Sequence, residues 1–285
     1  MAAKFTELKK HFYRRLKYRL LRPKPPTLSE LFSGPVVVVG SAPVSHKPAD
    51  FDETFRVITI NGSQVVTKAW GVEAPDVALV RYPEDAEDQL VAAILYGHTA
   101  HPMRQVQERV CKLSREEKEG IMDEYLKRRG KHDQPLRALE HLTYTFDILV
   151  DFGAFRDIQR HRMCTQTPQE LGPIHGYSTP PEIIRYGLLS KYDECMAHAQ
   201  EAYRAIEAEL PREAQYVLPL AFRKRALFTW NLREIHHFVQ LRSAKQGHIS
   251  YRHIARQVYR EVERVHPLLA RYIRVDLEDY ALARL

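Results

Sequence analysis

The composition describes a globular chain with a basic start and an electrically neutral body. The 285 residues are 44% hydrophobic and 10% aromatic, which is enough for a sizeable core and one or two domains. The net charge is +7, but residues 1–24 alone hold nine Lys and Arg against one acidic residue. The remainder holds 34 basic and 35 acidic residues. This distribution argues against nucleic-acid binding, which needs basic residues over a broad surface.

Cysteine usage and hydropathy indicate the compartment. The three cysteines, Cys111, Cys164 and Cys195, are widely separated and odd in number, so no disulfide framework is expected. No apolar run reaches the length of a membrane span, and the N-terminus lacks the apolar core of a signal peptide. We therefore expect a cytoplasmic protein.

Residues 1–30 are predicted to form a basic amphipathic helix followed by a linker. Apolar side chains recur at steps of three and four residues between Phe5 and Leu20, and prolines from Pro23 onward stop the helix. Such a helix can make peripheral contact with an anionic membrane through residues 1–24. It can equally dock on the protein's own body or on a sister subunit, and both interpretations stay open.

Residues 31–76 are predicted to be a short, incomplete Rossmann-like α/β segment. The run 36–39 is typical of a buried strand that enters a glycine turn, and a second strand is expected at 57–61. A third strand of the same compositional unit is expected at 77–80. The G-x-G-x-x-G pattern is absent and Pro43 disrupts the expected helix start, so a phosphate-binding role is the minor alternative.

Helical periodicity begins after residue 83. Helices are expected at 85–96 and 114–130, and Ser114 with Glu117 forms a capping box at the start of the second. His98 and His101 lie in the loop between them. We predict no metal site there, because no Cys or carboxylate completes a ligand set nearby.

A strand, a short helix and a basic triplet come next. Residues 143–150 alternate aromatic and β-branched residues with others, a period of two that predicts a strand. The helix that follows ends in Arg160, His161 and Arg162, and a long polar loop is expected after them. Guanidinium groups grip phosphate or carbonyl oxygens, so the triplet suits an anionic, planar ligand.

The C-terminal half is predicted to be mainly helical, with helices at 182–209, 229–244 and 250–265 and a buried apolar segment at 214–222. In the second of these helices Asn231, Ile235, Phe238 and Arg242 fall on one face. An apolar stripe with polar ends suits a ligand with a hydrophobic ring system. On spacing alone, an ordinary core stripe is the preferred interpretation.

Two blocks of the sequence resemble the flavin-dependent thymidylate synthases. The first block is Glu140-His141, the aromatic strand and the RHR triplet. The second block runs through AQYVLPLAF at 214–222, Asn231-Leu232-Arg233, Phe238, Leu241-Arg242 and Tyr251-Arg252. The order and spacing of these motifs are similar to those of the family over residues 77–285. The match favours a ligand-bearing face for the helix at 229–244.

The resemblance implies a fold, an activity and partners. The fold is α/β (α+β), with long helices packed on a mixed sheet. Family members bind FAD between the subunits of a homotetramer and reduce it with NADPH. They transfer a one-carbon unit from methylenetetrahydrofolate to C5 of dUMP, and the flavin hydride completes the methyl group. They use no nucleophilic cysteine, so Cys164 is not expected to act as one.

The resemblance also implies roles for individual residues. The flavin-contacting or nucleotide-contacting positions are Glu140, Arg160, His161, Arg162, Asn231, Arg233, His237, Leu241 and Arg242. Of these, Arg160 and Arg242 are expected nearest the nucleotide, where they would act catalytically by stabilising negative charge on the pyrimidine carbonyls. The substrate-binding positions are Arg160, Glu170, Gln215 and Arg242.

The nucleotide-binding positions depart from the family pattern. Glu170 stands where the family has a nucleotide-binding Ser, and Gln215 replaces an Arg that grips the nucleotide phosphate. A carboxylate repels phosphate, so the flavin half is expected to be kept and the dUMP half rewritten. Three alternatives follow: a working synthase with a variant loop, a flavin enzyme with another pyrimidine or a less charged acceptor, or a flavin-binding paralogue that serves as an assembly or regulatory subunit.

Overall fold

The computed structural model describes residues 36–39, 56–59 and 76–280. Two compact units make up the chain, Met1–Val72 and Glu73–Leu285. In the first unit, β1 (Val36–Val39) pairs in parallel with β2 (Arg56–Thr59). Both strands agree with the expected ones. The predicted amphipathic helix and the glycine turn after β1 lie outside the described residues.

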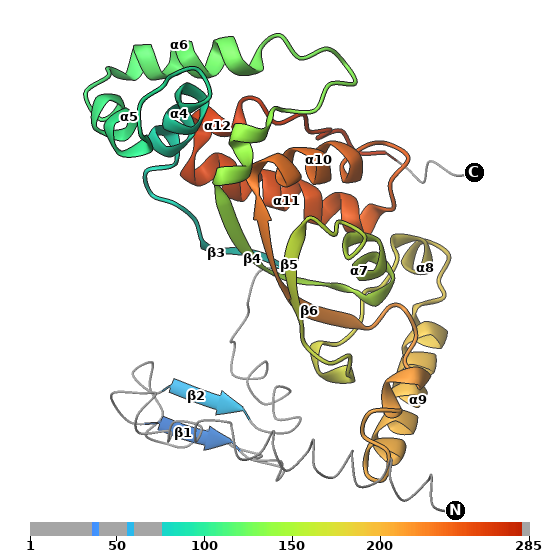
Figure 1. Ribbon diagram of the computed structural model, residues 1–285. Helices are drawn as coiled ribbons and strands as arrows, with labels where there is room; N and C mark the ends of the chain where they lie inside the picture. Colours follow the sequence, from blue (N-terminus) through green and yellow to red (C-terminus); the bar gives the residue numbers. More distant parts are fainter. Residues whose placement is uncertain (1–35, 40–55, 60–75, 281–285) are drawn as a thin grey trace, which may run out of the picture. The chain divides into compact units, whose positions relative to one another are not determined.

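The second unit is built on a four-stranded antiparallel sheet (Figure 1). Its strands are β3 (Val77–Arg81), β4 (Thr143–Asp151), β5 (Cys164–Pro168) and β6 (Arg223–Asn231), in the order β3-β4-β6-β5. The strand expected at 77–80 is confirmed, but its grouping with the preceding unit was wrong. Its apolar residues pair with β4, with Val77 opposite Ile148, because β4 offers it a long hydrophobic partner.

Two strands correct the sequence prediction. β5 occupies the segment expected to be a polar loop, and β6 occupies residues that were left outside any element or assigned to the start of a helix. In β6, Ala226, Phe228 and Trp230 are buried and alternate with more exposed residues. This period of two is the signal of a strand. The helix expected from residue 229 is confirmed only from Leu232 onward.

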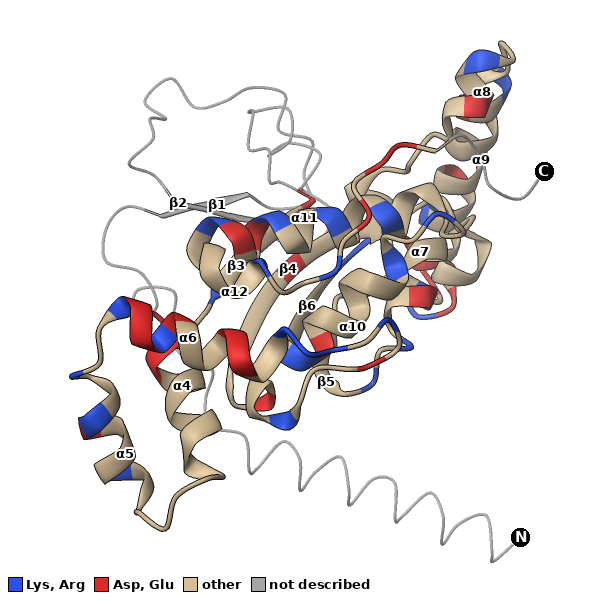
Figure 2. Ribbon diagram, turned by 90° about the horizontal axis from the view of Figure 1, so that it is seen from above, with Lys and Arg blue, Asp and Glu red and all other residues tan. Residues whose placement is uncertain are grey.

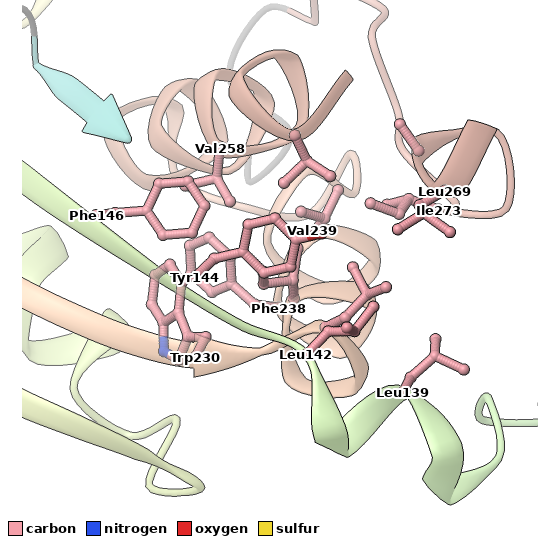
Figure 3. Packing of buried hydrophobic residues seen from close by; sticks show 14 of the residues in the cluster. Leu139, Leu142, Tyr144, Phe146, Trp230, Phe238, Val239, Val258, Leu269 and Ile273 are labelled. Atoms are coloured by element: carbon pink, nitrogen blue, oxygen red, sulfur yellow. The ribbon is translucent and has the colours of Figure 1, made fainter. Parts of the chain in front are cut away.

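One face of the sheet carries the main hydrophobic core. Tyr144, Phe146, Ile148 and Val150 of β4 are buried there, as their alternation predicts. Helices α10 (Leu232–Arg242) and α11 (Ile249–Val265) pack over this face (Figure 1). Figure 3 shows side chains of the strands and of both helices meeting in one cluster.

The other helical elements surround this sheet. They are α4 (Ala86–Tyr96), α5 (Met103–Val110), α6 (Arg115–Leu126), η1 (Arg137–His141), α7 (Phe152–Ile158), η2 (Pro173–His175), α8 (Pro181–Arg185), α9 (Leu189–Glu207), η3 (Ala214–Val217) and α12 (Pro267–Ala270). The capping box of Ser114 and Glu117 is confirmed at the start of α6. The helix expected at 182–209 is instead two helices. Gly187 lies between them with φ +66°, a left-handed conformation that favours glycine and ends α8.

The segment 214–222 is less buried than expected. Only Ala214, Leu218 and Phe222 are buried, whereas Tyr216 is 82% exposed. The buried residues recur every four positions, because the short turn η3 presents one side to a second apolar cluster formed with α9. The prediction that the whole run is buried was therefore wrong.

The described part of the chain has neither a membrane-spanning helix nor a cluster of metal ligands. None of its helices combines the length and the hydropathy that crossing a membrane requires. Within the same residues, no three side chains of His, Cys, Asp or Glu come together as a group that could hold a metal ion.

A buried histidine predicts that stability falls in acid. His236 on α10 is buried, and its Nε2 has no hydrogen-bond partner among the described residues. Burial, followed by the charges of Arg129 and Arg274, lowers its pKa to about 3. Below a pH of about 6.5, His236 takes up a proton in the unfolded chain but stays neutral in the folded chain. The free energy of unfolding therefore decreases as the pH falls. We expect His236 to reduce the free energy of unfolding by about 2 kcal/mol between pH 8 and pH 5.

The measurement is urea unfolding at a series of pH values. His236→Gln, whose side chain stays neutral, should flatten the acid slope, whereas His132→Gln at an exposed histidine should leave it unchanged. An identical slope in wild type and His236→Gln would contradict the prediction.

Candidate functional site

The turn between β4 and α7 positions the basic triplet. Asp151 ends β4, and its side chain accepts a hydrogen bond of 2.8 Å from the backbone N–H of Ala154 in the first turn of α7. The helix lasts only to Ile158, so Arg160, His161 and Arg162 follow directly after its end. A short, capped helix on the central strand therefore fixes where the triplet begins.

His161 points inward and connects two helices. Its side chain is 3% exposed, and its Nδ1 lies 2.8 Å from Oε1 of Glu234 in the first turn of α10. Its Nε2 accepts a hydrogen bond of 3.0 Å from Nε of Arg242 at the last turn of the same helix. The imidazole thus bridges the end of α7 to both ends of α10.

Arg242 is held on three sides. Besides its bond to His161, Nη2 donates to the backbone carbonyl of Asp157 at 2.8 Å, and Nη1 lies 3.7 Å from the Asp157 carboxylate. The guanidinium carbon lies 5.1 Å from the ring centroid of Tyr251. These contacts leave N–H groups of the guanidinium free to bind a ligand, because the group carries five donors.

A cleft of about 740 Å³ opens beside this network. Arg160 and Arg242 line it together with the acidic residues Asp151 and Asp157. Its other lining residues are Gly153, Ala154, Ser178, Thr179, Pro180, Pro181, Glu182, Leu220, Ala221, Gln246, Gly247, His248, Ile249, Ser250 and Tyr251. Basic and acidic segments lie next to each other around α7 and α10 (Figure 2). The cleft therefore combines apolar walls with a few polar side chains, the usual make-up of a small-molecule site.

The exposed residues of the triplet differ in their surroundings. The Arg160 side chain is 68% exposed, and Nη1 lies 3.4 Å from Oδ1 of Asp157. Arg162 is exposed and borders a smaller hollow of about 320 Å³ with Arg156, Gln159 and Arg160. Arg160 thus lies between the cleft and this basic hollow.

A second group of predicted site residues lies around Glu140. Its carboxylate accepts hydrogen bonds from Arg137 and, at 2.9 Å, from Nη1 of Arg233. The hydrogen bond from Arg137, followed by the charges of both arginines, holds the pKa of Glu140 below its usual value. Nε of Arg233 donates to the backbone carbonyl of Pro135. Neither Glu140 nor Arg233 lines the cleft.

The remaining predicted residues of α10 have different roles in the structure. Asn231 caps the helix, because its side-chain oxygen accepts from the backbone N–H of Glu234 at 2.8 Å. The ring of His237 lies 5.4 Å from that of His161, and burial lowers its pKa. Leu241 is exposed. The structure thus brings His161, His237 and Arg242 together and leaves Asn231 with a capping role.

The two altered substrate positions lie away from the cleft. Within residues 76–280, neither Glu170 nor Gln215 lines it or hydrogen-bonds to Arg160 or Arg242. The Gln215 amide donates to the backbone carbonyl of Arg212 at 2.8 Å. Both positions border one buried cluster, since their chain neighbours Leu171 and Ala214 belong to it.

Sequence reasoning missed Asp157 and Glu234, which fix Arg242 and His161. Asp157 carried a weak signal, because it lies three residues before Arg160 at the end of a short helix. Glu234 carried a better one, since Asn231-x-x-Glu234 has the spacing of a capping box. The contact between Glu234 and His161 had no local signal.

Comparison with known proteins shows the family. Residues 78–268 match the family model described as thymidylate synthase complementing protein. The chain belongs to this family. The family inferred from the sequence and the expected mixed α/β fold are therefore both confirmed.

Proteins similar to this chain carry two different names, and the share of each chain that the match covers also differs. A UPF0159 protein of Chlamydia pneumoniae is 36% identical over 215 residues, which are 74% of this chain and 40% of that protein. A UPF0159 protein of Thermoplasma acidophilum is 35% identical over 214 residues, 73% of this chain and 43% of its own. A flavin-dependent thymidylate synthase of Sulfurisphaera tokodaii is 32% identical over 144 residues, 48% of this chain and 56% of its own. The chain thus spans about two fifths of the length of the UPF0159 relatives.

Proposed function

We propose that this protein is an FAD-dependent, thymidylate-synthase-like transferase. It would transfer a one-carbon unit from methylenetetrahydrofolate to C5 of dUMP or a related pyrimidine, with NADPH as reductant. The observation that carries this proposal is the bonded set of Asp157, His161 and Arg242, which supports a guanidinium at the edge of a ligand-sized cleft. Membership of the family and the named synthase relatives support it.

The residues of the cleft fit a flavin. Leu220 and Ile249 supply apolar surface, and Arg160 and Arg242 supply donors for an anionic or carbonyl oxygen. A volume of about 740 Å³ is in the range of small-molecule sites. FAD bound by these residues would supply the hydride that completes a methyl group.

The side chains around the cleft supply orientation and charge. Arg242 is fixed before any ligand arrives, so its positive charge needs no rearrangement to stabilise negative charge on a pyrimidine carbonyl. Arg160 is mostly exposed and is able to turn toward a bound ligand. In this proposal Arg160 and Arg242 are the catalytic residues.

The distribution of the predicted flavin residues favours a homo-oligomer. Arg160 and Arg242 line the cleft and His161 is bonded to Arg242, whereas Glu140 and Arg233 form a separate pair outside it. A cofactor bound between subunits would use the first group of one copy and the second group of another. We therefore propose a homotetramer, as in the family that the sequence resembles.

Two measurements test this function. Purified protein should show the absorption of an oxidised flavin, either as isolated or after titration with FAD. Reduced protein should then release tritium from dUMP labelled at C5 when methylenetetrahydrofolate is present. A protein that ignores added FAD would overturn the proposal.

A second candidate function is a flavin-binding paralogue with altered or lost dUMP recognition. Glu170 favours it, because an exposed carboxylate now stands at a position expected to meet the nucleotide. Gln215 favours it further, because its amide is bonded to a backbone carbonyl and carries no charge. Tritium release from C5-labelled dUMP by FAD-loaded protein separates the two candidates. Only the synthase exchanges the hydrogen at C5, whereas the paralogue would bind FAD and release no tritium.

Neither Glu170 nor Gln215 lines the cleft, but the family resemblance assigns both positions to the nucleotide, so restoring the family's residues should strengthen dUMP binding. Glu170→Ser removes a repelling charge, and Gln215→Arg adds a fork for phosphate worth about 1.5–3 kcal/mol. Calorimetric titration of dUMP into FAD-loaded protein should show weak binding by the wild type. The double variant should bind more tightly than either single variant. Micromolar binding by the wild type, unchanged in all variants, would favour the synthase with its own mode of dUMP recognition.

A further inference from the structure

The neighbours of His161 determine which of its ring nitrogens carries the proton. Nε of Arg242 always carries a hydrogen, so His161 Nε2 at 3.0 Å must be the acceptor. A neutral imidazole then has its hydrogen on Nδ1. This atom lies 2.8 Å from Oε1 of Glu234, a carboxylate oxygen that accepts it. The two contacts therefore require the same tautomer.

The surroundings hold the ring in place. Glu234 has an 11% exposed side chain, so little water competes for the bond to Nδ1. The backbone carbonyl of His161 accepts hydrogen bonds from Cys164 Sγ at 2.8 Å and from Gln166 Nε2 at 2.9 Å. The rings of Phe238 and His161 meet in a T-shaped arrangement, with centroids 5.1 Å apart. The two ring hydrogen bonds and the contact with Phe238 oppose a turn of the ring that would exchange its partners.

Glu234 and Arg242 come from one helix and meet His161 from both sides. They lie eight residues apart on α10, about two helical turns, so they share a face. The hydrogen bond from the Glu234 backbone to Asn231 fixes the first turn of that helix. A rigid helix thus sets both contacts of the imidazole.

We propose that Glu234 is a positioning residue for the cleft. It keeps His161 in the Nδ1–H tautomer, so that Nε2 accepts from Arg242 and the guanidinium stays at the edge of the cleft. The effect of Glu234 on FAD binding rests on the proposed function.

Without Glu234 the other tautomer becomes accessible. Its Nε2–H would then face the Nε–H of Arg242 across 3.0 Å, two donors with no acceptor between them. Arg242 would turn away and lose its fixed orientation. The carboxylate acts on the cleft only through His161, because Glu234 itself does not line it.

The first test is nitrogen NMR of the full-length, cofactor-free protein labelled with ¹⁵N-histidine. The His161 signals, identified by their absence in His161→Asn, should show the Nδ1–H tautomer in the wild type. Glu234→Ala should populate the Nε2–H tautomer, and Glu234→Gln should restore the wild-type pattern because its amide oxygen still accepts. Glu108→Ala, which removes an exposed carboxylate on α5, is the matched control.

The second test is FAD titration of the same variants. Glu234→Ala should weaken FAD binding about ten- to a hundredfold, with near wild-type binding by Glu234→Gln and Glu108→Ala. If the wild type binds no FAD, the proposed function fails, and the tautomer measurement alone decides the role of Glu234. Unchanged His161 signals in Glu234→Ala, or Gln behaving like Ala in both tests, would overturn the inference.

Discussion

Trp230→Ala is expected to lower the free energy of unfolding by about 3–5 kcal/mol. Trp230 is fully buried near the end of β6, and its ring stacks on Phe238 of α10 with centroids 4.6 Å apart. Phe228 and Phe146 lie against it at 5.0 and 5.6 Å. Figure 3 shows Trp230 between the sheet and α10, so truncation opens a cavity where the two layers meet.

Circular dichroism during urea unfolding is the suitable measurement, because the substitution removes one of the two tryptophans that fluorescence would report. Trp230→Phe keeps an aromatic ring in the cluster and should lose only about 1–2 kcal/mol. Leu241→Ala, at an exposed position of the same region, should change little. Equal stability of Trp230→Ala and wild type would show that the sheet and α10 do not depend on this contact.

Arg242→Ala is expected to weaken FAD binding by about 1.5–3 kcal/mol or more, which is at least tenfold. The substitution removes a charged donor from the cleft and also leaves Nε2 of His161 and the carbonyl of Asp157 without their donor. Arg242→Lys should not rescue binding. A lysine ammonium is a point charge that lacks the planar fork needed to contact both partners and a ligand.

Fluorescence or absorbance titration with FAD measures this effect. Arg264→Ala is the matched control, because Arg264 on α11 forms an exposed pair with Glu261 and does not line the cleft. A urea unfolding curve for each variant separates loss of binding from loss of folding. Wild-type FAD affinity in Arg242→Ala would remove Arg242 from the proposed site.

Local patterns in the sequence were sufficient for several elements. The alternation in 143–150 predicted β4 and the side chains that it buries in the core. The Ser114–Glu117 spacing predicted the start of α6. The short helix before the basic triplet was predicted correctly, although it ends at Ile158 and does not include the triplet as expected. These features depend on residues a few positions apart, whose spacing directly sets which side chains share a face or cap a turn.

The strands β5 and β6 were missed because most of their residues do not show a clear strand pattern. β6 opens with Arg223-Lys224-Arg225, a run that resembles an exposed connection, yet it pairs with β4 along its whole length. Cross-strand partners bury its alternate residues, and burial decides strand formation in such a segment. β5 was missed for the same reason, since it is an edge strand of polar residues that pairs only with β6.

By itself, the sequence determined the family and the mixed α/β class, and it predicted which residues carry a cofactor. The tertiary structure alone decided which of these residues meet. It joined His161 to Glu234 and Arg242, placed Glu140 with Arg233 outside the cleft, and gave Asn231 a capping role. His161 and Arg242 are 81 residues apart in the chain, and no local periodicity links them. β4 and β6 pair antiparallel, with Asp151 opposite Arg223 and Thr143 opposite Asn231, so α7 and α10 start at opposite ends of the strand pair. Only the three-dimensional packing of α10 brings Glu234 and Arg242 to His161.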